Sequence, residues 1–142
     1  MSQYTTVLLL GTNLGDKKKN LLYALEQIKE DIGEITYQTS SLETEPVGYK
    51  SSNTYLNQAV EVKTPLSPIK LLKALKKIER SMGRTVDSTD RGYSDRTIDI
   101  DVVYYDKLRF TSAVLSLPHK AHTQEREFSK VLLTELQALK TL

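Results

Sequence analysis

The clearest periodic signal in the chain is a short segment in which apolar and acidic residues alternate. Ile98, Ile100 and Val102 fall on one side of an extended backbone. Asp99 and Asp101 fall on the other side, because successive side chains of a strand point to opposite faces of its sheet. The pattern predicts a strand that buries one face and presents two carboxylates on the other.

Three further strands are predicted from short apolar or β-branched runs that end at turn residues. They cover residues 5–10, 35–41 and 55–62. In the last of them Tyr55 and Asn57 share one face, where a ring and a carboxamide could stack on and hydrogen-bond a flat heterocycle. Such residues are also common on solvated strand faces, so the spacing leaves both interpretations open.

Helices are predicted where apolar residues recur at helical spacing. The first begins after Asp16 as N-cap and ends at Gly33, and the second begins at Ser67 and ends at Gly83. A short edge strand is expected at 108–110. A last helix, expected to cover the sheet, carries one apolar stripe. The stripe consists of Phe128, Val131, Leu132, Leu136 and Leu139.

The predicted order is strand, helix, strand, strand, helix, strand, followed by a C-terminal strand and helix. Two β-α-β units in this order are typical of an α+β fold with a ferredoxin-like antiparallel sheet (βαββαβ) and helices. The length of 142 residues is that of one ordinary domain, so residues 1–142 are expected to form a single domain. Unrelated activities occur on this fold, so function must be inferred from the site.

Composition narrows the class of protein. The formal net charge is only +2 and basic residues are mixed with acidic ones, so the electrostatic footprint of a nucleic-acid binder is missing. The chain has no cysteine, which excludes disulfides, cysteine zinc sites and thiol nucleophiles. No apolar run approaches the length of a signal-peptide core or a membrane span. We expect a cytoplasmic monomer that binds neither nucleic acid nor membrane.

Asp99 and Asp101 are candidate metal ligands. Residues two apart on a strand stand about 7 Å apart, and two ionised carboxylates side by side are unfavourable unless a cation lies between them. A pair of Mg²⁺ ions, completed by phosphate oxygens, would suit these ligands. The alternative is an edge strand whose two solvated aspartates discourage aggregation. The spacing alone does not decide between a metal site and a solvated edge strand.

The residues on either side of the acidic strand also have ordinary interpretations. The segment 84–95 has almost no apolar residue and no period, which predicts a mobile loop. Arg84, Arg91 and Arg96 fit a solvated loop. His119 and His122 fit a surface turn after Pro118.

Six short motifs occur along the chain. Four of them are the segments of residues 11–16, 40–48, 55–57 and 96–101. The fifth combines Ile78 and Glu79 with Gly83 and Arg84, and the sixth is Pro118 with His119. In this order and spacing they resemble the 6-hydroxymethyl-7,8-dihydropterin pyrophosphokinase family, over residues 5–135. The resemblance implies transfer of the β,γ-pyrophosphoryl group of ATP to the hydroxymethyl oxygen of the pterin, leaving AMP, in folate biosynthesis.

The resemblance also implies roles for individual residues. Asp99 and Asp101 would bind two Mg²⁺ ions, and Arg84 and Arg96 would complete the catalytic set by neutralising phosphate charge. The residues expected to bind ATP are Glu79, Arg84, Arg96, Val102, Ser116, His119 and Arg126. The residues expected to bind the pterin are Thr44, Val47, Tyr55, Asn57, Tyr93 and Phe128. The expected partners are therefore two small-molecule substrates.

The chain departs from the family's pattern beside this site. Ser94-Asp95-Arg96 stands where the family has Gly-Pro-Arg, and the loop before it is longer, which leaves the roles of Arg91 and Tyr93 open. One extra residue lies between His119 and Arg126. The phosphate contacts therefore stay open among His119, Lys120, His122 and Arg126.

Two other classes fit paired aspartates on a ferredoxin-like sheet. A metal-dependent nucleotidyltransferase would release pyrophosphate rather than AMP, and it would need a basic primer-binding surface. An RNA-binding module of the same fold would need aromatic residues on its central strands. In such a module Asp99 and Asp101 would repel phosphate unless metal ions intervened.

Overall fold

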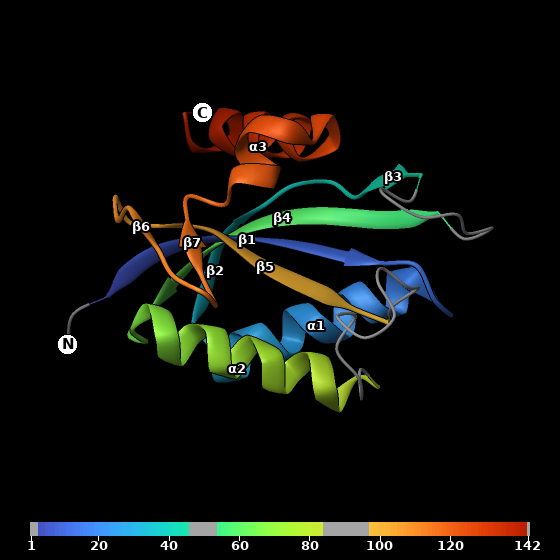
Figure 1. The fold of residues 1–142 in the computed structure, drawn as a ribbon. Helices are drawn as coiled ribbons and strands as arrows, with labels where there is room; N and C mark the ends of the chain where they lie inside the picture. Colours follow the sequence, from blue (N-terminus) through green and yellow to red (C-terminus); the bar gives the residue numbers. More distant parts are fainter. Residues whose placement is uncertain (1–2, 46–53, 84–96, 142) are drawn as a thin grey trace.

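A computed structural model describes residues 3–45, 54–83 and 97–141 of the chain. The fold is α+β, with an antiparallel sheet between two layers of helices (Figure 1). The strands are β1 Tyr4–Thr12, β2 Glu34–Gln38, β3 Leu42–Thr44, β4 Tyr55–Thr64, β5 Asp99–Tyr105, β6 Phe110–Thr111 and β7 Ser116–Leu117. The helices are α1 Lys17–Asp31, α2 Pro68–Ser81, a π-helical turn η2 Ala121–Glu125, and α3 Glu127–Lys140.

The main sheet has the strand order β2-β4-β1-β5, with β3 also paired to β4, and each of these pairs is antiparallel. This confirms the predicted α+β class with an antiparallel sheet. Two predicted strands differ in detail. The strand expected at 35–41 ends at Gln38, and pairing with β4 resumes in β3. The edge strand expected at 108–110 is instead a two-residue strand at Phe110–Thr111, paired with β7.

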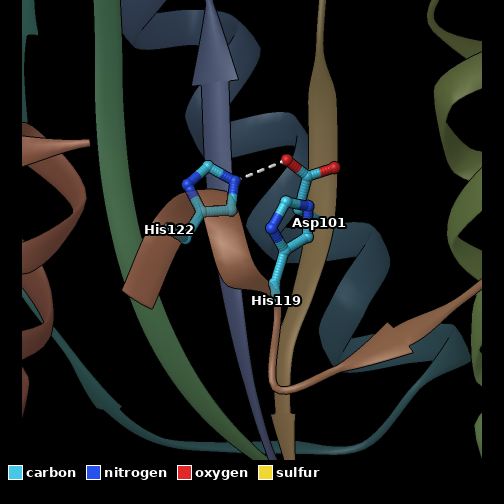
Figure 2. Close-up of side chains that lie close together, drawn as sticks. All are labelled: Asp101, His119 and His122. Atoms are coloured by element: carbon cyan, nitrogen blue, oxygen red, sulfur yellow. Dashed lines mark hydrogen bonds and ion pairs between the residues drawn. The ribbon is translucent and has the colours of Figure 1, made fainter. Parts of the chain in front are cut away.

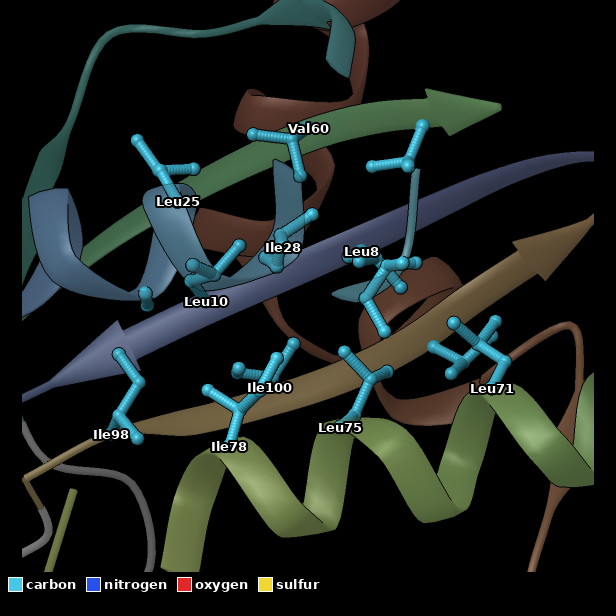
Figure 3. Close-up of a cluster of buried hydrophobic side chains, with 14 of the residues drawn as sticks. Leu8, Leu10, Leu25, Ile28, Val60, Leu71, Leu75, Ile78, Ile98 and Ile100 are labelled. Atoms are coloured by element: carbon cyan, nitrogen blue, oxygen red, sulfur yellow. The ribbon is translucent and has the colours of Figure 1, made fainter. Parts of the chain in front are cut away.

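Helices α1 and α2 cover one face of the sheet and enclose the larger hydrophobic core (Figure 3). The apolar face of β5 takes part as predicted, because Ile98, Ile100 and Val102 are at most 4% exposed. They pack with α2 side chains such as Leu75 and Ile78. Burying one such side chain contributes roughly 1.5–3 kcal/mol. The core therefore fixes which face of β5 carries the two aspartates.

Helix α3 covers the opposite face of the sheet (Figure 1). Leu132 and Leu136 pack there against Leu9, Ala59 and Val103. The predicted covering role of the last helix is confirmed.

The predicted apolar stripe of α3 was partly wrong. Val131 is 54% exposed, whereas Ser129 is fully buried. Ser129 precedes Leu132 by three positions and so lies on its face of the helix, whereas Val131 is rotated about 100° away from Leu132. The serine hydroxyl is tolerated in the interior because it hydrogen-bonds the ring of His122.

The helix ends follow the predicted capping residues. The Asp16 carboxylate accepts the backbone N–H of Lys19 at 3.1 Å, and the Ser67 hydroxyl accepts that of Lys70 at 3.4 Å. Gly83 follows α2 with φ of +103°, a conformation that favours glycine. Among the described residues, no helix is both long enough and apolar enough to cross a membrane.

Candidate active site

Three residues on adjacent strands lie in one row across the sheet. Gly11 of β1 pairs with Asn57 of β4 on one side and with Asp99 of β5 on the other. Directly opposed residues of antiparallel strands point to the same face, so Asn57 and Asp99 stand two strand spacings apart, about 10 Å, on one surface. The next row, Ala59, Leu9 and Asp101, has the same orientation.

Gly11 keeps this surface open between its two neighbours. A Cβ atom on Gly11 would lie 3.1 Å from Asn57 Oδ1 and 3.5 Å from Tyr55 Cδ1. Even an alanine would therefore crowd the carboxamide of Asn57, and it would touch the Tyr55 ring at an ordinary contact distance. The glycine leaves a flat strip of backbone on which a planar ligand can lie.

Asp101 is held by a buried histidine that follows the β6–β7 hairpin. His122 Nε2 lies 2.7 Å from Asp101 Oδ2 (Figure 2). On the other side of the ring, His122 Nδ1 lies 2.6 Å from Ser129 Oγ. His122 is only 2% exposed. The interpretation of His122 as a surface-turn residue was therefore wrong.

The π-helical turn η2 presents His122 to β5. The resemblance noted from the sequence implies one extra residue between His119 and Arg126, and this five-residue turn lies in that interval. A π turn accommodates a residue that a regular helix would exclude, and such turns are frequent at functional sites.

Asp101 stays ionised in this setting. Burial by itself would raise its pKa, but the hydrogen bond and positive charge of His122 outweigh burial. Arg126, and His119 when it is protonated, act in the same direction, and the pKa of Asp101 lies below its ordinary value. A carboxylate that remains negative near neutral pH is a suitable cation ligand.

His119 stands beside this pair. Its backbone N–H donates to the Val103 carbonyl at 3.0 Å, and its ring centroid lies 4.4 Å from that of His122. Burial is the main cause that lowers the pKa of His119, which favours the neutral imidazole. Its Nδ1 is buried and has no hydrogen-bond partner within the described part of the chain.

A cleft of about 540 Å³ opens beside β5. Both aspartates line it, and so do all the described residues that were expected to bind ATP. Those residues are Glu79, Val102, Ser116, His119 and Arg126. They come from α2, β5, β7 and the segment leading into α3, so the fold brings together residues that are far apart in the sequence.

Two residues of this cleft add to the sequence-based expectation: Glu79 is buried and hydrogen-bonded to β5, and Lys76 was not predicted. Glu79 is 4% exposed, and its carboxylate accepts the backbone N–H of Ile100 at 2.8 Å, which ties α2 to β5. Lys76 lines the same cleft and was missed by sequence analysis. Its position three residues before Glu79, on the same helical face, was the signal available.

The described pterin residues gather around β4. Asn57 Nδ2 donates to the Leu42 carbonyl at 3.1 Å and to Thr44 Oγ1 at 2.8 Å. Because a backbone carbonyl can only accept, the amide orientation is fixed and Oδ1 remains available as an acceptor. Phe128 packs on the α3 side of the sheet, with its ring edge-on to His122 at a centroid distance of 6.3 Å.

Several expected site residues lie outside the described residues. They are Val47, Arg84, Tyr93 and Arg96, and Arg91, whose role was left open, also lies outside them. The predicted mobile loop 84–95 lies outside them as well.

Comparison with known proteins gives one consistent family. The model of the 7,8-dihydro-6-hydroxymethylpterin-pyrophosphokinase (HPPK) family matches residues 7–138. The 2-amino-4-hydroxy-6-hydroxymethyldihydropteridine pyrophosphokinase of Porphyromonas gingivalis is 36% identical over 89% of this chain and 86% of its own length. The mitochondrial folate synthesis bifunctional protein of Pisum sativum is 38% identical over 92% of this chain, which spans only 24% of that protein.

Solved structures agree on the fold. Wild-type HPPK-DHPS of Plasmodium falciparum, crystallised with pteroate, superposes with a TM-score of 0.72 over 95% of this chain, at 16% identity. The chain covers 41% of that protein. At this identity the likeness supports the fold alone.

Proposed function

The chain belongs to the HPPK family, and on that premise we propose that it transfers pyrophosphate from ATP to 6-hydroxymethyl-7,8-dihydropterin, a step of folate biosynthesis. One observation carries the proposal beyond the family assignment. Asp99 belongs both to the cleft that gathers the expected ATP residues and to the sheet row that contains Asn57. A nucleotide in the cleft and a pterin on the row would therefore meet at this carboxylate.

ATP occupies the cleft beside β5 in this proposal. Lys76, His119, Lys120 and Arg126 are the basic side chains among the described residues that line it, and they can donate hydrogen bonds to phosphate oxygens. Arg84 and Arg96, expected from the resemblance to act on the phosphates, would add charge from the segment just before β5. Pyrophosphoryl transfer needs mainly positioning and positive charge around developing negative charge, so no nucleophilic side chain is required.

The two aspartates would hold Mg²⁺. Both line the cleft, and Asp101 is kept ionised, so the donor set suits a hard divalent cation. When bound, such ions polarise phosphate oxygens and lower the pKa of a coordinated hydroxyl. We propose two ions, which Asp99 and Asp101 would hold together with oxygens of ATP.

The pterin would lie over Gly11. Asn57 Oδ1 can accept hydrogen bonds from ring N–H or amino groups, and Thr44 holds the carboxamide in that orientation. Tyr55 and Phe128 can contact the ring faces or edges, and Val47 and Tyr93 are expected to complete the pocket. The hydroxymethyl group would then point along the row toward Asp99.

Three broader assignments are part of the proposal. The strand order β2-β4-β1-β5, with α1 and α2 on one face, supports the ferredoxin-like class. Residues 1–142 are proposed to form a single domain. The proposed oligomeric state is a monomer, with ATP and the pterin as the only substrates.

Product analysis tests the proposed reaction. ATP labelled at the γ-phosphate is incubated with Mg²⁺ and hydroxymethyldihydropterin, with Asp101→Asn as the matched inactive control. We expect AMP and labelled pterin diphosphate in equal amounts, both dependent on the pterin. Release of pyrophosphate would favour the nucleotidyltransferase alternative instead. AMP formation at the level of the Asp101→Asn variant would overturn the proposal.

A further inference from the structure

Three side chains near the cleft form a group with a different ligand chemistry from the aspartate pair. One ligand atom from each of Asp101, His119 and His122 can be chosen so that all three lie within 4.8 Å of one another (Figure 2). We propose that these residues form a binding site for a divalent transition metal of the zinc class.

The spacing of the three groups fits such an ion after small adjustments. Ligand atoms that surround a tetrahedral zinc ion at 2.0–2.1 Å stand about 3.3 Å from one another. His122 Nε2 and Asp101 Oδ2, at 2.7 Å, would move apart slightly, and His119 would move closer to them. Shifts of this size are of the order that rotation about side-chain torsions produces.

His122 has the surroundings expected of a metal-binding imidazole. Metal-bound histidines nearly always have their second ring nitrogen held by a hydrogen bond, which fixes the ring orientation. Ser129 Oγ does this for His122 Nδ1 at 2.6 Å, and Ser129 is itself fully buried on α3. Nε2 is thereby directed at Asp101.

His119 supplies an independent observation. Its Nδ1 is buried and makes no hydrogen bond within the described residues. Buried polar atoms are rarely left unpaired, and an unpaired one calls for a missing partner such as an ion. A metal ion could bind Nδ1 itself and so supply the missing partner. It could also bind the other ring nitrogen and turn the ring so that Nδ1 finds a partner.

The donor set selects the kind of metal. Mg²⁺ prefers oxygen ligands, whereas two imidazole nitrogens with one carboxylate oxygen suit zinc, cobalt or nickel. Three protein ligands with an open coordination position are a common arrangement for such ions. The chain contains only two histidines and no cysteine. His119 and His122 are therefore the only pair of imidazoles in the chain that could bind such an ion.

The site has a regulatory consequence that rests on the proposed function. Asp101 would be shared between this ion and the Mg²⁺ proposed for catalysis. An ion held by His119 and His122 would engage that carboxylate, so zinc is expected to inhibit turnover and a chelator to restore it. Binding of the ion itself does not depend on what reaction the protein catalyses.

Cobalt provides a spectroscopic test of binding. The full chain, without a polyhistidine tag and freed of metal by chelation, is titrated with Co²⁺ while its visible absorption is recorded. We expect one saturable ion per chain. His119→Gln and His122→Gln should each weaken binding at least about tenfold, and Asp101→Asn should do the same. Asp99→Asn is the matched control and should bind Co²⁺ as the wild type does.

Each other outcome contradicts the site. Absence of saturable binding, or wild-type affinity in both histidine variants, would show that the imidazoles hold no ion. Equal losses in Asp99→Asn and Asp101→Asn would place the ion at the aspartate pair instead. Circular dichroism checks that each variant is folded. Should His122→Gln fail to fold, the more exposed His119 decides the question.

Discussion

Asn57 and Asp99 flank the same glycine from opposite sides, because Gly11 of β1 pairs with Asn57 on β4 and with Asp99 on β5. A residue expected to bind the pterin and a residue expected to bind metal thus share one row on one surface. The distance between their strands is about 10 Å, which is two strand spacings. This relationship connects the two halves of the proposed active site and gives the first prediction.

Gly11→Ala is expected to weaken pterin binding about tenfold while leaving the fold intact. The new methyl group would stand 3.1 Å from Asn57 Oδ1 and displace it. Stability should change little, because alanine in a strand costs less conformational entropy than glycine. Calorimetry with the pterin measures the first effect and thermal unfolding the second. Wild-type pterin affinity in this variant would show that the strip above Gly11 is not the pterin surface.

Asn57→Ala is expected to reduce both stability and pterin affinity. The carboxamide links β3 to β4 through Leu42 and Thr44, so its loss should cost roughly 1–2 kcal/mol of unfolding free energy. Loss of Oδ1 should weaken pterin binding by roughly 1–3 kcal/mol, with little change for ATP.

Thr44→Val is the matched control for Asn57→Ala. It removes one internal partner of the carboxamide and leaves Oδ1 in place. It should therefore lower stability with a smaller effect on the pterin. Equal losses of ATP and pterin affinity in Asn57→Ala would give Asn57 a purely structural role.

The Asp101–His122 pair predicts a pH dependence of stability. The pKa of Asp101 is lower in the folded protein than its ordinary value of 3.8, so the folded state binds fewer protons there than the unfolded state. The stabilisation is complete above the unfolded value and is lost as pH falls through the folded value. The difference in unfolding free energy between wild type and Asp101→Asn should shrink as pH falls below about 4. Urea unfolding at several pH values tests this, and a constant difference would contradict it.

Leu132→Ala and Val131→Ala form a matched pair for the packing of α3. Leu132 is 1% exposed against the sheet, so its truncation should cost about 2–5 kcal/mol. Val131 is 54% exposed, and its truncation should change stability by about 0.5 kcal/mol or less. Chemical denaturation of both variants compares them directly. Similar losses would mean that Val131 lies on the buried face after all.

Local patterns were enough to predict most of the fold. The alternation of Ile98, Asp99 and Ile100 fixed both the strand and its buried face, since one apolar face can be packed in only one orientation. The caps at Asp16 and Ser67 fixed the helix starts. Helix α3 was harder, because Val131 and Leu132 are adjacent apolar residues and only the contact with the sheet decides between them.

The site was less accessible to sequence reasoning. The row of Asn57, Gly11 and Asp99 depends on pairing between strands that are distant along the chain, which no local period encodes. The contact between His122 and Asp101 depends on a π-helical turn, and a lone histidine in a polar segment gives no signal of it. The metal stoichiometry, the roles of Arg84 and Arg96, and the compartment stay predictions.

A ternary-complex crystal structure tests the central claim most directly. Full-length protein is crystallised with Mn²⁺, a nonhydrolysable ATP analogue and hydroxymethyldihydropterin, and the metal is located by anomalous scattering. Mn²⁺ accepts the oxygen ligands that Mg²⁺ uses. We predict metal bound by the carboxylates of Asp99 and Asp101, triphosphate in the cleft beside β5, and the pterin over Gly11 against Asn57. Metal ions that contact neither carboxylate, or a pterin bound away from Gly11, would contradict the account.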